Sequence, residues 1–150
     1  MRSINDYLTE DHHACDDLFA EAENAVAAND WTAAEPRFQA FRDATLRHFA
    51  REEAVLFPAF ETASGMTGGP TWVMRDEHAR MREALDALSA AVGRRDAEGY
   101  LGHSETLLML MGQHNMKEGQ ILYRMCDQVL VAQAEDLLGR MREQSEAVPG

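Results

Sequence analysis

Two segments of the chain carry a histidine four residues ahead of a glutamate. His48 precedes Glu52, and His114 precedes Glu118. On an α-helix, residues four apart share one face, with Cβ atoms about 5–6 Å apart, so each pair would present an imidazole and a carboxylate together. Two such pairs that faced each other could chelate metal from opposite sides. The spacing therefore predicts a metal site, provided that the rest of the chain brings the two segments face to face.

The rest of the chain has the pattern of four long amphipathic helices. Apolar residues recur at intervals of three and four over about 3–29, about 30–62, 70–93 and about 97–130, as on helices with one buried face. Each predicted buried face contains at least one histidine. In chain order the faces are Leu8, His12, Cys15, Phe19, Ala22 and Val26; Phe38, Phe41, Thr45, His48, Glu52 and Leu56; Met74, His78, Met81, Leu85, Leu88 and Val92; and His103, Leu107, Met111, His114, Glu118, Ile121 and Met125.

Several residues mark the ends of these helices. Ser3 is a typical N-cap, and Asp30 or Thr32 can cap the second helix. Pro58 has no amide proton and is expected to kink or loosen the second helix near its end. Segment 63–69, rich in glycine and small residues, is an expected loop, and Pro70 suits the first position of the third helix.

The fold class expected from these elements is all-α. Short connections favour an up-down-up-down four-helix bundle over about 3–130. A short extra C-terminal helix, over about 133–143, is expected to pack on its outside, and residues 145–150 should form a frayed tail. With 150 residues, the chain is expected to be a single domain over 1–150.

The antiparallel arrangement predicts that six polar residues converge. Depths from the end where the first and third helices begin follow from the rise of about 1.5 Å per residue. They are about 12–14 Å for His12 and His78, about 15–18 Å for Glu52 and Glu118, and about 21–24 Å for His48 and His114. His103 lies three turns away from His114 and is expected outside this layer, as is His13, which points about 100° away from His12.

The alternative interpretation is that the histidines are ordinary core residues and that a buried glutamate forms a salt bridge with an arginine. A buried imidazole needs a partner, however, and a buried carboxylate must be paired or bind a cation. Because all six fall in one layer on four helices, we predict that they are metal ligands: His12, His48, Glu52, His78, His114 and Glu118.

Composition excludes several classes of function. The formal net charge of −12 disfavours nucleic acid and anionic membranes as partners. No apolar run approaches the roughly 20 residues needed to span a membrane. The first six residues lack the apolar core of a signal peptide, and Cys15 and Cys126 are expected to be reduced, so the expected location is the cytoplasm.

The chain resembles the hemerythrin-like HHE cation-binding domain family. The resemblance rests on residues 7–12, 48–58, 77–78 and 114–123 and covers about residues 3–130. It implies a four-helix bundle around a non-haem di-iron centre. In that arrangement the four histidines are terminal ligands, and Glu52 and Glu118 bridge two iron ions, with an oxo or hydroxo bridge as a further ligand.

The ligand pattern differs from that of the oxygen-carrying hemerythrins. Those proteins use five histidines, with His-x-x-x-His on the third helix and His-x-x-x-x-Asp on the fourth. Here Met74 and Arg82 lie four residues before and after His78, and the acid on the fourth helix is Glu118. The order His, His-x-x-x-Glu, His, His-x-x-x-Glu is similar to the iron-cluster-repair branch of the family.

Three functions follow as hypotheses. The first is a di-iron protein that binds, senses or reduces O2, NO or peroxide. The second is a protein that stores iron or donates it to damaged iron–sulfur clusters. In the third, the metal stabilises a bundle that binds a partner protein. Imidazole and carboxylate ligands suit iron, but manganese and zinc are alternatives.

Residues around the ligands are harder to assign from sequence. Asp11, Asp76 and Glu77 are candidates to hold the ligand histidines through hydrogen bonds. Tyr123, five residues after Glu118, and Tyr7, five before His12, are either hydrogen-bond donors to the site or aromatic residues of a helix face; the second interpretation is favoured. Cys15, one turn from His12, either flanks the site or packs as a small apolar residue.

Overall fold

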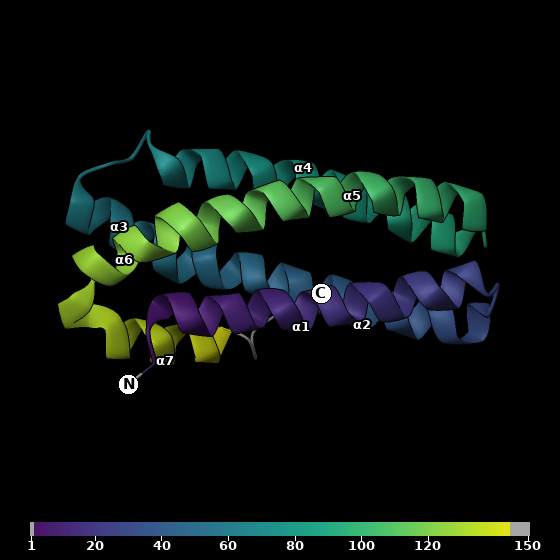
Figure 1. Cartoon of the computed structure of the whole chain (residues 1–150), viewed down its shortest axis with the longest axis horizontal. Coiled ribbons are helices and arrows are strands. Elements are labelled where there is room, and N and C mark those ends of the chain that lie inside the picture. The colour runs from purple at the N-terminus through teal and green to yellow at the C-terminus, as the bar shows by residue number, and fades with distance from the viewer. Residues whose placement is uncertain (1, 145–150) are drawn as a thin grey trace.

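The computed structural model describes residues 2–144, and these form four long antiparallel helices packed in a bundle with a short C-terminal helix (Figure 1). The elements are α1 (Ile4–Ala27), α2 (Trp31–Arg51), the π-helix η1 (Glu52–Leu56), α3 (Phe57–Ser64), α4 (Pro70–Gly93), α5 (Ala97–Lys117), the π-helix η2 (Glu118–Leu122), α6 (Tyr123–Val129), the 3-10 helix η3 (Val131–Gln133) and α7 (Ala134–Gln144). The second long helix is α2–η1–α3, and the fourth is α5–η2–α6. The predicted fold class is therefore confirmed; the predicted tail at 145–150 lies outside the described residues.

Side-chain caps explain where the long helices begin. The Ser3 side chain accepts a hydrogen bond from the amide three residues on, at 2.9 Å. Asp30, and not Thr32, caps α2 in the same way at 3.3 Å, and Asp96 caps α5 at 2.9 Å. Pro70 is the first residue of α4, as predicted. Each cap satisfies an amide that has no partner within its helix.

Two apolar clusters fill the bundle, one on each side of the polar layer. The cluster toward the α1–α2 turn includes Phe19, Phe38, Phe41, Leu85, Leu88 and Leu107. The other, toward α3 and α6, includes Ile4, Leu8, Leu56, Phe60, Leu122 and Leu130. The chain passes from one cluster to the other on every long helix, and the histidines lie at the crossing points. Burial on both sides holds these polar residues away from water.

The C-terminal helix completes the second cluster. Figure 1 shows α7 at the same end of the bundle as α3 and α6, beside the start of α1. It contacts α1, α2 and η1 and buries Leu137, Leu138 and Met141. The predicted fifth helix is confirmed. Across residues 2–144, none of the helices has both the length and the apolar character that crossing a membrane requires.

The π-helices correct the predicted face of the fourth long helix. Ile121, predicted to be buried, is 55% exposed, whereas Leu122 and Cys126 are buried. A π-turn closes a hydrogen bond between residues five apart, so it inserts about one extra residue and moves the buried face one position later. On the second long helix, η1 loosens the chain just before Pro58, as predicted. Because η2 forms without a proline, the missing amide is not the common cause.

A second correction concerns the start of that face. His103 is exposed, and the buried residue is the neighbouring Ser104, whose hydroxyl donates a hydrogen bond to Glu23. Both positions fit the spacing to Leu107, and the polar partner on α1 selects Ser104. His103 therefore lies on the surface of α5.

Candidate metal centre

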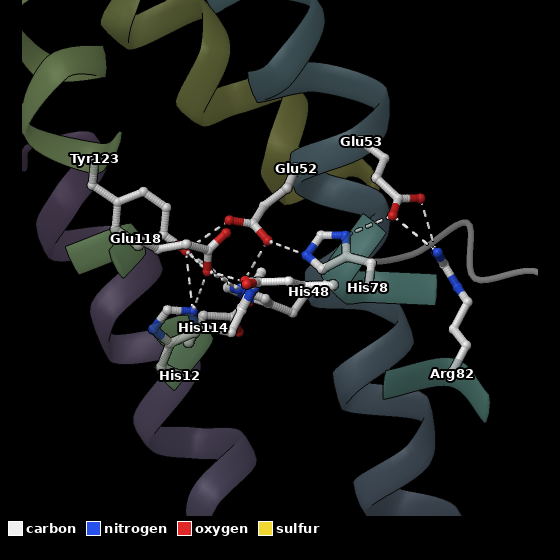
Figure 2. Close-up of polar contacts among 11 residues, drawn as sticks. His12, His48, Glu52, Glu53, His78, Arg82, His114, Glu118 and Tyr123 are labelled. Carbon is white, nitrogen blue, oxygen red and sulfur yellow. Dashed lines mark hydrogen bonds and ion pairs between the residues drawn. The ribbon is translucent and has the colours of Figure 1, made fainter. Parts of the chain in front are cut away.

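The six predicted ligands come together in one buried layer (Figure 2). They arrive from α1, the α2–η1 junction, α4 and the α5–η2 junction, and none is more than 7% exposed. Their donor atoms form two groups that share one carboxylate: Glu52, His78, His114 and Glu118, and His12, His48 and Glu118. Two buried clusters with a shared carboxylate fit a binuclear metal site. His13, by contrast, is exposed.

The spacing of the donor atoms also fits metal ions. Nε2 of His78 lies 3.1 Å from Oε1 of Glu52, and Nε2 of His114 lies 3.1 Å from Oε1 of Glu118. Ligand atoms about 2.1 Å from a metal ion and at right angles to each other are about 3.0 Å apart. Four buried atoms that could bind a metal ion nevertheless have no hydrogen-bond partner: Oε1 of Glu52, Oε2 of Glu118, and Nε2 of His78 and of His114. Buried polar atoms without partners are costly unless a cation binds them.

Three of the four histidines donate a hydrogen bond from Nδ1 to a carboxylate on the preceding helix. Each carboxylate is next in sequence to a predicted ligand but holds a histidine on the following long helix. The pairs are Asp11 with His48 at 2.7 Å, Glu53 with His78 at 2.6 Å, and Glu77 with His114 at 2.8 Å. Asp11 and Glu77 were predicted for this role. Glu53 was missed, although its place beside Glu52 follows the same rule.

These hydrogen bonds fix which ring nitrogen faces the centre. An ionised carboxylate can only accept a hydrogen bond, so Nδ1 carries the proton. In the neutral ring, the lone pair is then on Nε2, which points into the centre. Such outer hydrogen bonds hold ligand histidines in one tautomer and one orientation.

Each outer carboxylate is in turn neutralised by a cation. Arg51 lies 2.7 Å from Asp11, Arg82 lies 2.8 Å from Glu53, and Lys117 pairs with Glu77. Burial tends to raise the pKa of Glu53, but its hydrogen bonds with His78 and Arg82 outweigh that effect and lower the pKa to about 2. The acids therefore stay ionised and keep accepting from the histidines. Asp76, the third predicted candidate, pairs instead with Arg80 at 3.3 Å.

His12 is the exception among the four histidines. Among the described residues, no carboxylate accepts a hydrogen bond from its Nδ1. Glu53 directly follows Glu52, and the corresponding position after Glu118 is Gly119. The metal position at His12 and His48 thus has one outer carboxylate, from Asp11, whereas the one at His78 and His114 has two.

Charges within the layer are strongly coupled. Burial alone would lower the pKa of His48, but the Glu52 carboxylate and the hydrogen bond to Asp11 raise that pKa well above its ordinary value. Burial would raise the pKa of Glu118, but hydrogen bonding to Glu52 and the charge of His114 hold that pKa well below its usual range. Metal ions bound here would replace protons, because imidazole must be deprotonated at Nε2 to bind metal.

Tyr123 enters the centre, which the sequence did not reveal. Its hydroxyl lies 2.7 Å from Oε2 of Glu52 and 2.9 Å from Oε1 of Glu118 (Figure 2). The sequence left Tyr123 open between hydrogen bonding to the site and packing on a helix face, with the second favoured; on a regular α-helix, a residue five positions on points about 140° away. In η2 the Tyr123 amide bonds to the Glu118 carbonyl, which places the two side chains one π-turn apart. Tyr7, the other candidate, packs under Arg51 and Arg142 instead.

A small cavity borders His12 and His48, on the side of the polar layer opposite Glu52 and Glu118. Its volume is about 20 Å³, room for one water-sized molecule. It is lined by His12, Cys15, Thr45, His48, Phe49, Met81, Met111 and Asn115. The Thr45 hydroxyl is buried and has no oxygen or nitrogen hydrogen-bond partner among the described residues. Cys15, like Cys126, is a free buried thiol, and burial raises the pKa of Cys15 despite the opposing charge of His48.

The cavity adjoins a groove on the surface of the bundle. The groove has a volume of about 510 Å³ and runs between α1 and α5 past Asp16, Ala20 and Gly112. Met111 and Asn115 line both the groove and the cavity. These two side chains therefore separate the histidines from solvent on this side.

Comparison with known proteins agrees with this geometry. The family model described as the hemerythrin HHE cation binding domain matches residues 3–126, which include all six clustered histidines and glutamates. Searches of the curated proteins and of the solved structures return no match. Since the family model covers most of the chain, the protein belongs to the hemerythrin HHE cation-binding domain family.

Proposed function

We propose that the protein is a non-haem di-iron protein that binds and reacts with a small ligand such as O2, NO or peroxide. The observation that carries the proposal is the set of buried histidine nitrogens and carboxylate oxygens without hydrogen-bond partners, in a layer where His12 and His48 border a cavity with room for one water-sized molecule. His12, His48, His78 and His114 would be terminal ligands, and Glu52 and Glu118 would bridge. Bound iron would supply the redox chemistry and the positions at which a small ligand binds.

The number of donors supports an open centre. Two metal ions with about six ligands each need about twelve donor positions. Four histidines supply four, and two bridging carboxylates supply four more. About four positions remain for solvent or a small molecule. A metal that served only the stability of the bundle would be expected in a closed site.

Thr45 supports the choice of ligand. Its hydroxyl lines the cavity, is buried, and has no oxygen or nitrogen hydrogen-bond partner among the described residues. A bound diatomic molecule or peroxide would accept a hydrogen bond from it. The remaining wall is largely apolar, with Phe49, Met81 and Met111, which suits a small uncharged molecule.

The ligand set also bears on the branch of the family. The two positions where an oxygen carrier would place a further histidine hold Met74 and Arg82. Met74 is buried in the apolar cluster, and Arg82 is engaged with Glu53. The proposed ligand set of four histidines and two glutamates is similar to that of the repair branch, and we take it to favour reaction or sensing over reversible oxygen storage.

Iron donation to damaged clusters is the second candidate, and burial argues against it. Glu52, His78 and Glu118 are fully buried, so release of iron to an acceptor would require the bundle to open. A partner-binding bundle is the third candidate. It is supported by exposed apolar side chains on one side of α5: Leu108, Met109 and Met116.

The test is metal content together with optical spectra. Protein purified without air should contain two iron ions per chain, and exposure to O2, NO or peroxide should produce new charge-transfer bands. A single zinc ion, or a spectrum indifferent to all three ligands, would contradict the proposal. Rapid transfer of iron to a chelating acceptor, with no spectral response, would favour the donation hypothesis instead.

A further inference from the structure

We propose that Tyr123 is itself a metal ligand, binding as phenolate at the His12–His48 position, so that the two metal ions are chemically different. The inference rests on the proposed di-iron centre. It assigns a seventh protein ligand to a centre for which the sequence predicted six.

The first argument is the number of polar atoms around one phenol group. The Tyr123 oxygen lies 2.7 Å from Oε2 of Glu52 and 2.9 Å from Oε1 of Glu118. It also lies 3.1 Å from Nε2 of His12 and 3.4 Å from Nε2 of His48. A phenol has one proton and can donate it to one of these atoms at a time. Four donor atoms gathered around a fifth are better explained by a shared cation.

The second argument is distance. Neighbouring ligands of one metal ion are about 3.0 Å apart when each lies about 2.1 Å from the metal. All four distances from the Tyr123 oxygen, 2.7 to 3.4 Å, are close to that value. The spacing between Nε2 of His12 and Oε1 of Glu118, 3.0 Å, agrees as well. The phenol oxygen is thus placed as one more ligand of the same metal position.

The third argument is that the other half of the centre has no such group. Phe57 follows Glu52 by five residues, as Tyr123 follows Glu118, and its amide bonds to the Glu52 carbonyl in the same way. Its ring stacks on His78 with centroids 5.7 Å apart. The two halves therefore present corresponding aromatic rings, and only the one beside His12 carries an oxygen.

Charge explains why the oxygen is on that side. The His78–His114 position has two outer carboxylates, Glu53 and Glu77, whereas Gly119 leaves His12 without one. When the metal binds, the Tyr123 O–H bond breaks, its proton leaves to solvent, and an oxygen lone pair forms the bond to the metal. The phenolate adds a negative charge directly at the metal that has fewer outer carboxylates, and favours the trivalent ion there.

The experiment uses the full chain loaded with two ferric ions. Phenolate bound to ferric iron produces a broad visible charge-transfer band, and resonance Raman spectra excited in it show tyrosine ring vibrations. Histidine and carboxylate ligands give no such vibrations. We expect the band in the parent protein and in Tyr7→Phe, the matched control, and its complete loss in Tyr123→Phe with iron still bound. Tyr100 packs on Phe38 in the other apolar cluster, so it cannot supply the band.

A second measurement needs no mutation. Parent protein made with ring-deuterated tyrosine should show shifted Raman vibrations, because the chain's three tyrosines are then labelled. The assignment of Tyr123 as a ligand would be overturned if the parent protein bound two ferric ions without showing the band, or if the band persisted in Tyr123→Phe. Either result would leave the di-iron proposal standing. Failure of the chain to bind iron at all would overturn both, and iron counts on the same samples separate the two cases.

Discussion

Glu53 of η1 accepts a hydrogen bond from Nδ1 of His78 on α4, over 2.6 Å. Arg82, one turn further along α4, holds the same carboxylate through two hydrogen bonds of 2.8 and 2.9 Å. The acid beside Glu52 therefore orients a histidine on the next long helix. Asp11 and Glu77 repeat the arrangement for His48 and His114, which ties the four helices together around the metal centre.

Glu53→Gln should weaken metal binding at the His78 side. The amide oxygen can still accept from Nδ1, but the negative charge that strengthens His78 as a ligand is lost. Loss of such an outer partner typically costs about 10–100-fold in metal affinity. Competitive titration against a chelator measures the change. Asp76→Asn is the matched control, since Asp76 touches no histidine, and an equal loss in both variants would contradict the assigned role.

The same variant should change how stability depends on pH in the metal-free protein. The pKa of Glu53 is lowered to about 2 from an ordinary value of 4.5. A lowered carboxyl pKa adds stability above pH 4.5 that is lost as the pH falls toward 2. The full shift corresponds to about 3 kcal/mol, and partial exposure reduces it to about 1–2 kcal/mol. Urea unfolding should show the parent more stable than Glu53→Gln by that amount at pH 6, with the difference shrinking below pH 4.5.

Glu118→Ala should remove both metal ions, because this carboxylate belongs to both donor groups. His114→Ala should remove at least one, since His114 belongs to a single group. Both variants should keep most of their helix content, because the two apolar clusters remain. Metal analysis and circular dichroism test this, with exposed His13→Ala as the control. Parent-like metal content in Glu118→Ala would refute the shared ligand.

Thr45→Val should have opposite effects on stability and on ligand binding. Valine has a similar shape but no hydroxyl, and the buried Thr45 hydroxyl has no hydrogen bond to an oxygen or nitrogen to lose. The metal-free protein should be as stable as the parent or more so, by up to about 1 kcal/mol. NO should bind about fivefold to tenfold more weakly, because a hydrogen bond of about 1 kcal/mol is missing. Thr45→Ser keeps the hydroxyl and should restore affinity; equal affinities in all three proteins would exclude Thr45 from the ligand site.

Ala20→Trp should slow the association of small ligands. Ala20 lines the groove between α1 and α5 that leads to Met111 and Asn115. A bulky ring there would obstruct the path to the cavity without touching any clustered histidine or glutamate. Ala90→Trp is the matched control, because Ala90 is exposed on α4 and does not line this groove. Stopped-flow mixing with NO should show a severalfold slower rate for Ala20→Trp alone, and equal rates would mean that ligands enter elsewhere.

The sequence by itself determined the helices and the six clustered residues. Three of the four predicted buried faces, each carrying a histidine, are buried throughout. Helical periodicity is local, so the placement of His12, His48 and His78 on buried faces followed from spacing alone. Depth along antiparallel helices was enough to place them at one level, since each residue advances the helix by a fixed rise.

Tertiary structure decided what surrounds those residues. The π-turn η2 shifted the buried face of the fourth long helix, which exposed Ile121 and turned Tyr123 into the centre. Glu53 was found only through its contact with His78, because the partner lies on another helix. These features depend on how one helix meets the next, and a repeat of 3.6 residues along a single helix carries no information about the neighbour.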